Sequence, residues 1–285
     1  MLLVCTVWGF NFVAAKVGVR EIPPLLFTGL RFSILALVLL PFLKPARGRM
    51  RQVMVIALFN GAIHFGLMFI GIAMTAASVV AVVAQLNVPF ATMLSIFFLG
   101  EVVHMRRWFG IALTIVGVTI VSFDPHVFDA LTGVLFAAGA ALSAAVAAVC
   151  MRNLSNVGVF QLQAWTALIT APLLLSASFL FETGQIHALL HAQPITWAAL
   201  LFTTIGASLI GHNAYYYLLQ RYEVSLIAPL SLLSPLLGVV FGISLLGEPM
   251  SMRIVLGALT AFAGVGVLAL ASRKKALPRQ TAPQA

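Results

Sequence analysis

Residues 234–249, SPLLGVVFGISLLGEP, decide the fold because a close copy, VPFATMLSIFFLGEV, occurs earlier at residues 88–102. Each copy carries Leu-Gly-Glu just before its last residue, so Glu101 aligns with Glu248. Three further pairs keep the same displacement: Ser78 with Ser225, Gly110 with Gly257, and Gly117 with Gly264. Pro89 and Pro235 align after one inserted residue. These ordered matches predict a chain built from two similar halves.

Composition places both halves in a membrane. Hydrophobic residues make up 62% of the chain, charged residues only 8%, and the mean hydropathy is +1.09. A soluble domain carries about a quarter of its residues as charged side chains, whereas a lipid-embedded chain needs charges only in its loops. The sequence therefore predicts an integral membrane protein.

Apolar segments of about 17 to 25 residues can cross the hydrocarbon core as helices. Alternating strands with polar inner faces are absent, which favours an all-α protein over a barrel. The chain has ten such segments, at residues 1–19, 24–43, 53–74, 78–99, 107–123, 132–151, 159–181, 195–219, 225–246 and 252–271.

Five helices per half have a geometric consequence, because an odd number makes the second half enter the membrane from the opposite side. The sequence thus predicts two inverted five-helix repeats, 1–122 and 132–271, followed by a basic cytoplasmic tail at 272–285. Inverted repeats are common in transporters that expose a midplane site to each side in turn. The alternative is that duplication merely built a larger bundle.

The distribution of basic residues orients the chain. With the N-terminus in the cytoplasm, most of the 16 basic residues fall on the cytoplasmic side, as the positive-inside rule requires. This predicts an N-in, C-in topology and explains the net charge of +9. A nucleic-acid partner is not favoured, because no basic face is interleaved with aromatic residues. The basic residues in question are Lys44, Arg47, Arg49, Arg51, Arg106, Arg107, Arg152, Arg221, Arg273, Lys274, Lys275 and Arg279.

Several motifs together resemble the EamA family of the drug/metabolite transporter superfamily. They are WGFNFVAAKVGV at 8–19, LRF at 30–32, the two LGE corners with their following glycines, and QRYEVSLIAPLSLLSP at 220–235. The last motif is similar to bacterial cysteine and amino-acid metabolite exporters, including the aromatic amino acid exporter branch. The resemblance implies ten helices, inverted halves, a central cavity and export of small organic solutes. Some relatives carry a Trp in the sixth helix, where this chain has SAAVAAV at 143–149, so no contact of that Trp can be transferred.

Polar groups inside a spanning helix mark places where lipid is absent, because a central Arg or Lys costs about 2.5 to 3.5 kcal/mol. In the first helix, Trp8, Asn11, Phe12, Ala15 and Lys16 share one stripe, which we expect to face a cavity. Trp8 could instead be an interfacial aromatic residue. Lys16 lies near the outer end, where snorkelling to the membrane surface is favoured.

The third and eighth helices carry matching polar groups. Asn60 and His64 lie one turn apart, and His64 aligns within one residue of His212, which shares a face with Tyr216. We predict that all four line the cavity. The histidines are either packed neutral groups or proton carriers.

The fourth, seventh and ninth helices complete the predicted lining. Gln85 and Asn87 precede Pro89, Ser231 precedes Pro235, and Trp165 begins the seventh helix. Paired prolines free backbone carbonyls and bend the two helices. Arg31 is the one deep fixed cation. It either binds a substrate carboxylate or neutralises carbonyls at a helix end.

The missing residue types also restrict function. All seven acidic residues lie in or beside loops, so no membrane-centre carboxylate can bind a proton or Na⁺. The sequence has no GxxxxGK[ST], HExxH or GxSxG motif, which excludes the corresponding ATPases and hydrolases and favours a non-enzyme without cofactor or metal. Cys5 and Cys150 show no metal or disulfide spacing.

These features predict a transporter of the bacterial inner membrane that exports small neutral or aromatic amino acids, or related metabolites, by alternating access. Helices one, three, four, six, seven, eight and nine would line its cavity. Facilitated diffusion and proton coupling through histidine remain alternatives. A broader drug or nucleoside exporter is the second hypothesis, and a channel the third. The partners are a small solute and the bilayer; the sequence leaves the oligomeric state open.

Overall fold

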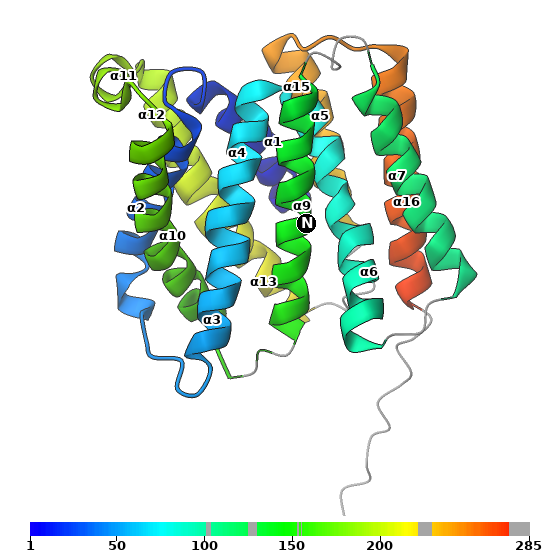
Figure 1. Ribbon diagram of the computed structural model, residues 1–285, viewed down its shortest axis with the longest axis horizontal. Helices are drawn as coiled ribbons and strands as arrows, with labels where there is room; N and C mark the ends of the chain where they lie inside the picture. Colours follow the sequence, from blue (N-terminus) through cyan, green and yellow to red (C-terminus); the bar gives the residue numbers. More distant parts are fainter. Residues whose placement is uncertain (101–103, 125–129, 153, 155, 222–229, 274–285) are drawn as a thin grey trace, which may run out of the picture.

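The computed structural model is a bundle of helices, with no strand among the residues it describes, namely 1–100, 104–124, 130–152, 154, 156–221 and 230–273 (Figure 1). Seven helical spans in this part of the chain are long and apolar enough to cross a membrane. They are Met50–Met74, Ala77–Phe98, Met105–Ser122, Leu131–Arg152, Val159–Phe181, Pro194–Tyr215 and Met252–Ala271. The prediction of an all-α membrane protein is confirmed.

Three further apolar helices are shorter: α1 (Leu2–Gly18), α2 (Pro24–Val38) and α15 (Leu233–Leu246). Residues 222–229, at the start of the predicted ninth span, lie outside the described residues. A short helix that the sequence did not predict, α11 (Gln185–His191), lies in the connection before α12 (Pro194–Leu201). The remaining straight helices are α7 (Met105–Ser122), α9 (Leu131–Arg152), α10 (Val159–Phe181) and α16 (Met252–Arg273).

Three spans change helix type along their length. The third runs through α3 (Met50–Ile56), a π-helical segment η2 (Ala57–Ile63) and α4 (His64–Met74). The eighth has a π segment in the corresponding place, η4 (Phe202–Gly211), between α12 and α13 (His212–Arg221). The fourth consists of α5 (Ala77–Val83), a 3₁₀ turn η3 (Ala84–Leu86) and α6 (Asn87–Leu99).

The π segments expose carbonyls that an α-helix would use internally, and side chains bind them. The Ser143 hydroxyl donates to the Phe59 carbonyl at 2.6 Å, and the Gln163 amide donates to the Ser208 carbonyl at 2.9 Å. Such π segments often occur at functional sites, because they redirect side chains and free backbone groups. Here they redirect the third and eighth spans where these spans pass the centre of the bundle.

Helices α7 and α16 pack side by side, at the right of Figure 1, and glycines lie where their backbones meet. A Cβ on Gly117 would lie 2.3 Å from the Ala261 nitrogen, and one on Gly264 would lie 2.5 Å from the Thr114 nitrogen. Backbones can approach this closely only where no side chain intervenes. These glycines therefore allow the two helices to pack closely, whereas Gly266 has open space beside it.

Acidic side chains fasten one end of the bundle, the upper end in Figure 1, where α5 and α12 begin. Glu248 accepts the backbone N–H groups of Ala77 and Ser78 at the start of α5, at 2.6 and 2.9 Å. Glu182 accepts those of Leu25 and Leu26 at the start of α2, at 2.7 and 3.0 Å. Carboxylates suit helix N-termini because the exposed N–H groups and the helix dipole are both positive there.

Glu21 and Asp124 cap two more helices at the same end. Glu21 accepts the Gln193 N–H and the Thr196 hydroxyl, each at 2.7 Å, at the start of α12. Asp124 binds the Ser251 hydroxyl, whose oxygen accepts the Ile254 N–H at the start of α16. Each of these four carboxylates thus joins a helix from one half of the sequence to a helix or loop from the other.

Candidate functional site

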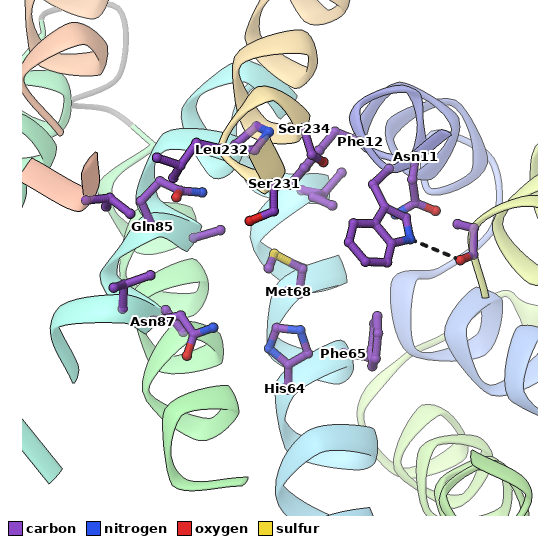
Figure 2. Close-up of a pocket in the computed structure, with 18 of the residues that line it drawn as sticks. Asn11, Phe12, His64, Phe65, Met68, Gln85, Asn87, Ser231, Leu232 and Ser234 are labelled. Carbon is purple, nitrogen blue, oxygen red and sulfur yellow. Dashed lines mark hydrogen bonds between the residues drawn. The ribbon is translucent and has the colours of Figure 1, made fainter. Parts of the chain in front are cut away.

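A cavity of about 640 Å³ lies in the centre of the bundle. This volume is typical of pockets for small organic ligands. Its lining includes Val265, Leu268 and Ala269 in the second half of α16, and Ile72 near the end of α4. The side chains that line it come from both halves of the chain (Figure 2).

Most of the predicted binding residues meet in this cavity. Figure 2 shows His64 and Met68 between Gln85 and Asn87 on one side and Phe65 and Asn11 on the other. The predicted residues that line the cavity are Trp8, Asn11, Phe12, His64, Gln85, Asn87, His212 and Ser231. Their role in binding a solute stays a prediction.

The other predicted residues lie elsewhere. Asn60 lines a second cavity of about 90 Å³, which shares Phe65 and His212 with the first. The Trp165 indole N–H donates to the Lys44 carbonyl at 2.8 Å, and Trp165 lines neither cavity. The side chain of Tyr216 lies outside the described part of the structure.

Trp8 is fixed in place at the cavity wall. Its indole N–H donates to the Ala207 carbonyl at 3.2 Å, and its ring packs against His212 and Tyr215 with centroid distances of 5.2 Å. Gly211 makes room for the ring, since a Cβ there would lie 2.5 Å from the indole nitrogen. Trp8 therefore presents a rigid aromatic surface rather than a mobile gate.

The two histidines each use one ring nitrogen within the protein. His64 Nδ1 lies 2.9 Å from the Ala140 carbonyl, and His212 Nδ1 lies 3.0 Å from the Ala207 carbonyl. A carbonyl can only accept, so each Nδ1 carries its proton and Nε2 is the acceptor of the neutral ring. If the histidines are packed neutral groups, these hydrogen bonds satisfy Nδ1 of each ring and leave Nε2 to be explained.

The amides of the cavity hold unused hydrogen-bonding capacity. The Oδ1 atoms of Asn11 and Asn87 are buried and have no hydrogen-bond partner in the part of the chain that the structure describes. Gln85 makes only a long contact of 3.5 Å from its amide nitrogen to the Ala81 carbonyl. Unpartnered buried acceptors are costly, and a bound donor would relieve that cost.

Arg31 enters the cavity wall from α2 and is 2% exposed. Its Nη2 donates to the Ser208 hydroxyl oxygen at 2.9 Å, and Nε and Nη1 have no partner. Its guanidinium carbon lies 4.8 Å from the Phe65 ring centroid and 5.6 Å from that of Phe69. Such cation–π contacts contribute about 0.5 to 2 kcal/mol each, less than the several kcal/mol of burying a charge.

Lys16, the other cation within a span, is satisfied differently. Its ammonium donates to the carbonyls of Ile72, Ala73 and Thr75 at 2.7, 3.2 and 2.8 Å, at the end of α4. Three donors thus meet three acceptors, and the positive charge lies at the negative end of a helix dipole. Lys16 serves the fold, and it reaches helix α4 rather than the membrane surface.

Sequence reasoning missed part of the lining. Helices two and ten were not among the predicted lining helices, yet helix two contributes Arg31 and helix ten contributes Val265, Leu268 and Ala269. The predicted seventh helix lines only the smaller cavity, with residues that include Gln163. Met68 could have been found, because it follows His64 by one helical turn. The apolar residues of α16 gave no signal, since they are the same types that face lipid.

Chemically, the cavity combines aromatic and aliphatic surface with neutral polar groups and one guanidinium. Among the described residues, no group of three His, Cys, Asp or Glu side chains could hold a metal ion. Cys5 donates to the Leu230 carbonyl at 3.3 Å, and Cys150 is likewise a free thiol. The arrangement is suited to holding an amphipathic solute.

Comparisons with known proteins agree with this description. The chain is 32% identical to a protein of Escherichia coli named probable amino-acid metabolite efflux pump, over 96% of this chain and 95% of the relative. It is also 32% identical to a Salmonella typhimurium protein of the same name, over 93% and 91% of the two chains. A solved structure of a protein 22% identical in sequence has the same fold, with a TM-score of 0.63 over 96% of this chain and 97% of the other.

The model of the EamA-like transporter family matches the chain twice, at residues 1–123 and 131–270. Together these matches cover nearly the whole sequence. The protein is therefore a multi-pass membrane transporter, and it belongs to the EamA-like transporter family.

Proposed function

We infer that this protein exports small neutral or aromatic amino acids, or related metabolites, across the bacterial inner membrane. The central cavity is the observation that carries this proposal. Its aromatic and aliphatic wall fits an apolar side chain, and its amides and guanidinium fit the two charged ends of an amino acid. The names of the two relatives point to the same solute class.

The proposed architecture has ten crossings, N-in and C-in, arranged as two inverted repeats at 1–122 and 132–271. The double family match, the π segments in the third and eighth spans, and the matching left-handed glycines support it. Gly100 and Gly247 both end their helices with positive φ, at 63° and 66°, as the two aligned LGE corners require. In this topology the capped upper end of Figure 1 faces outward.

Transport would proceed by alternating access, in which the capped outer end and the cytoplasmic end open in turn. All four carboxylate caps are formed in the structure, so it corresponds to an outward-closed state in this proposal. Opening outward would require some of these caps to break. In this proposal the fourth span moves against the ninth, and that motion involves the Glu248 cap, which joins the two spans.

We expect transport to be uncoupled from ions. None of the residues lining the cavity in the described part of the chain is acidic, so no carboxylate there can carry a proton or bind Na⁺. An uncoupled carrier suits a solute that accumulates inside the cell and is dilute outside. His64 and His212 are the competing route for protons.

Counterflow in liposomes tests this function. Purified protein is reconstituted, preloaded with unlabelled neutral or aromatic amino acids, and supplied with trace labelled solute, with and without a pH gradient. We expect saturable counterflow that ignores the gradient. Acceleration by the gradient that is lost in His64→Gln or His212→Gln would establish proton coupling. No counterflow for any amino acid would contradict the substrate class and favour drugs or nucleosides, and non-saturable flux would indicate a channel.

A further inference from the structure

Arg31 is the one fixed charge among the cavity-lining residues that the structure describes, and the lining contains no Asp, Glu or Lys. It is almost completely buried, and among the described residues its five N–H donors have a single hydrogen-bond partner, the Ser208 hydroxyl. Ser208 itself donates to the Thr203 carbonyl at 3.2 Å, so it offers Arg31 a neutral acceptor and no negative charge. The positive charge is therefore uncompensated within the described part of the protein.

The contrast with Lys16 shows that this is not how the fold satisfies a structural cation. Lys16 donates to three carbonyls at a helix end and does not line the cavity. Arg31 has no carbonyl partner among the described residues, so neutralisation of helix-end carbonyls does not explain it. The aromatic rings around it lower the cost of burial but do not neutralise the charge, and they leave Nε and Nη1 without an acceptor.

We propose that Arg31 makes the cavity selective for solutes that carry a carboxylate, and that it excludes organic cations. This rests on the proposed function and names the group that the site recognises. In a low-dielectric cavity, an uncompensated guanidinium attracts an anionic group and repels a cationic one more strongly than it would in water. A carboxylate also matches the geometry of a guanidinium, since both are planar and can form paired hydrogen bonds.

The rest of the cavity fits the other end of an amino acid. The Oδ1 atoms of Asn11 and Asn87 lack donors, and in Figure 2 these side chains lie on opposite sides of Met68. An ammonium group donates three hydrogen bonds and accepts none, so it complements such oxygens. A zwitterion would thus orient with its carboxylate toward Arg31 and its ammonium toward an asparagine. A molecule with an ammonium group but no carboxylate would be repelled by the Arg31 charge and would have no group that Arg31 attracts.

Binding of matched solutes to the wild-type protein is the first test. One series contains phenylalanine, 3-phenylpropionate, phenylalanine amide and phenethylamine; the second contains leucine, 4-methylpentanoate, leucine amide and isoamylamine. Dissociation constants come from quenching of tryptophan fluorescence, with thermal stabilisation as a second readout. We expect the carboxylates to bind at least about tenfold tighter than the matched cations, because one hydrogen bond to a charged group contributes enough free energy for that difference. Equal binding of acid and amide would overturn the proposal. It would also be overturned if none of the four carboxylates in the two series bound.

Substitution then assigns the preference to Arg31. Arg31→Gln should weaken carboxylate binding by about 10- to 100-fold and leave amide binding unchanged or tighter. Arg31→Lys keeps the charge and should retain the preference for acid over amide. Lys16→Gln removes a cation outside the cavity and is the matched control, so its acid-to-amide ratio should equal that of wild type. A wild-type ratio in Arg31→Gln would overturn the assignment, and if that variant does not fold, the wild-type series decides.

The counterflow experiment separates this inference from the function on which it rests. Amino-acid counterflow that is equally inhibited by acid and amide would leave the function standing and remove the role of Arg31. Carboxylate-selective binding that depends on Arg31, without counterflow of any amino acid, would do the reverse. In that case the cavity would bind carboxylates, but amino acids would not be its transported solutes.

Discussion

Single carboxylates position whole helices in this protein, and Glu21 shows how such a contact depends on pH. The Thr196 hydroxyl and the Gln193 N–H hold the pKa of Glu21 below its ordinary value, because both donate to the charged form. A lowered pKa in the folded state means that the contact stabilises the fold above the ordinary pKa. That contribution is lost as the pH falls through the lowered value.

The variant Glu21→Gln should therefore melt at a lower temperature than wild type at pH 7, and the difference should shrink on acidification until it vanishes. Melting is followed by the intrinsic fluorescence of the detergent-solubilised protein between pH 7 and 3. Thr196→Val removes the hydroxyl donor, so in that background the pH-dependent difference between the proteins with and without Glu21→Gln should be smaller. A gap between wild type and Glu21→Gln that stays constant with pH would show that Glu21 acts through packing, not charge.

At the scale of the helices, the close approach of the α7 and α16 backbones can be tested by substitution. A Cβ on Gly117 meets backbone atoms of Ala261 and Gly257, which cannot move as a flexible side chain can. Gly117→Ala should lower the free energy of unfolding by about 1 to 3 kcal/mol through overpacking. Thermal melts compare it with Gly266→Ala on the same helix pair, where a Cβ meets open space. That control should be neutral or more stable by about 0.5 to 1 kcal/mol, because alanine favours the helix. Equal melting temperatures for the two variants would contradict close packing at Gly117.

The Glu248 cap joins the end of α15 to the start of α5, so it should also bias the direction in which the cavity opens. Glu248→Gln removes the charge that binds two N–H groups, a loss of about 0.5 to 2 kcal/mol. We expect a severalfold increase in outside labelling of Ser234→Cys, in the cavity wall, by a membrane-impermeant thiol reagent. The background carries alanine at both native cysteines.

Glu182→Gln is the control for this labelling experiment, since it breaks an equivalent double cap on α2 that does not involve α5 or α15. It should cost similar stability without raising the labelling rate. Equal labelling in both variants would mean that the caps stabilise the bundle and do not set its direction of opening.

For the whole molecule, the proposed motion of α5 against α15 can be stopped directly. A Cβ on Gly238 would lie 3.2 Å from the Ala81 Cβ, close to the separation of about 3.5 to 4.5 Å found in disulfides. The variant Ala81→Cys/Gly238→Cys should lose counterflow on oxidation and regain it with a reductant. The reduced protein and the two single variants under oxidation are the controls. Full turnover of the cross-linked protein would rule out relative motion of this pair.

Much of the fold was predictable because membrane insertion depends on local properties. Length and hydrophobicity of each segment identify a spanning helix wherever it lies in the chain, and the spans described here were all found in this way. The glycines of the repeated LGE corners likewise indicate left-handed backbone at the helix ends, since glycine adopts that conformation most easily. The sequence by itself therefore determined the class, the helices and the internal similarity of the two halves.

The cavity depended on tertiary structure, because its lining comes from helices far apart in the chain. Polar residues such as Asn11, Asn87 and His212 were found in advance, since a polar side chain in a span needs a polar neighbour. Leu268 and Ala269 were not, because an apolar side chain can face lipid, a packed helix or a cavity with equal ease. Arg31 and Lys16 both lie within predicted spans, and their contacts decide their roles: Lys16 is satisfied by three carbonyls, and Arg31 is left with its charge beside the cavity.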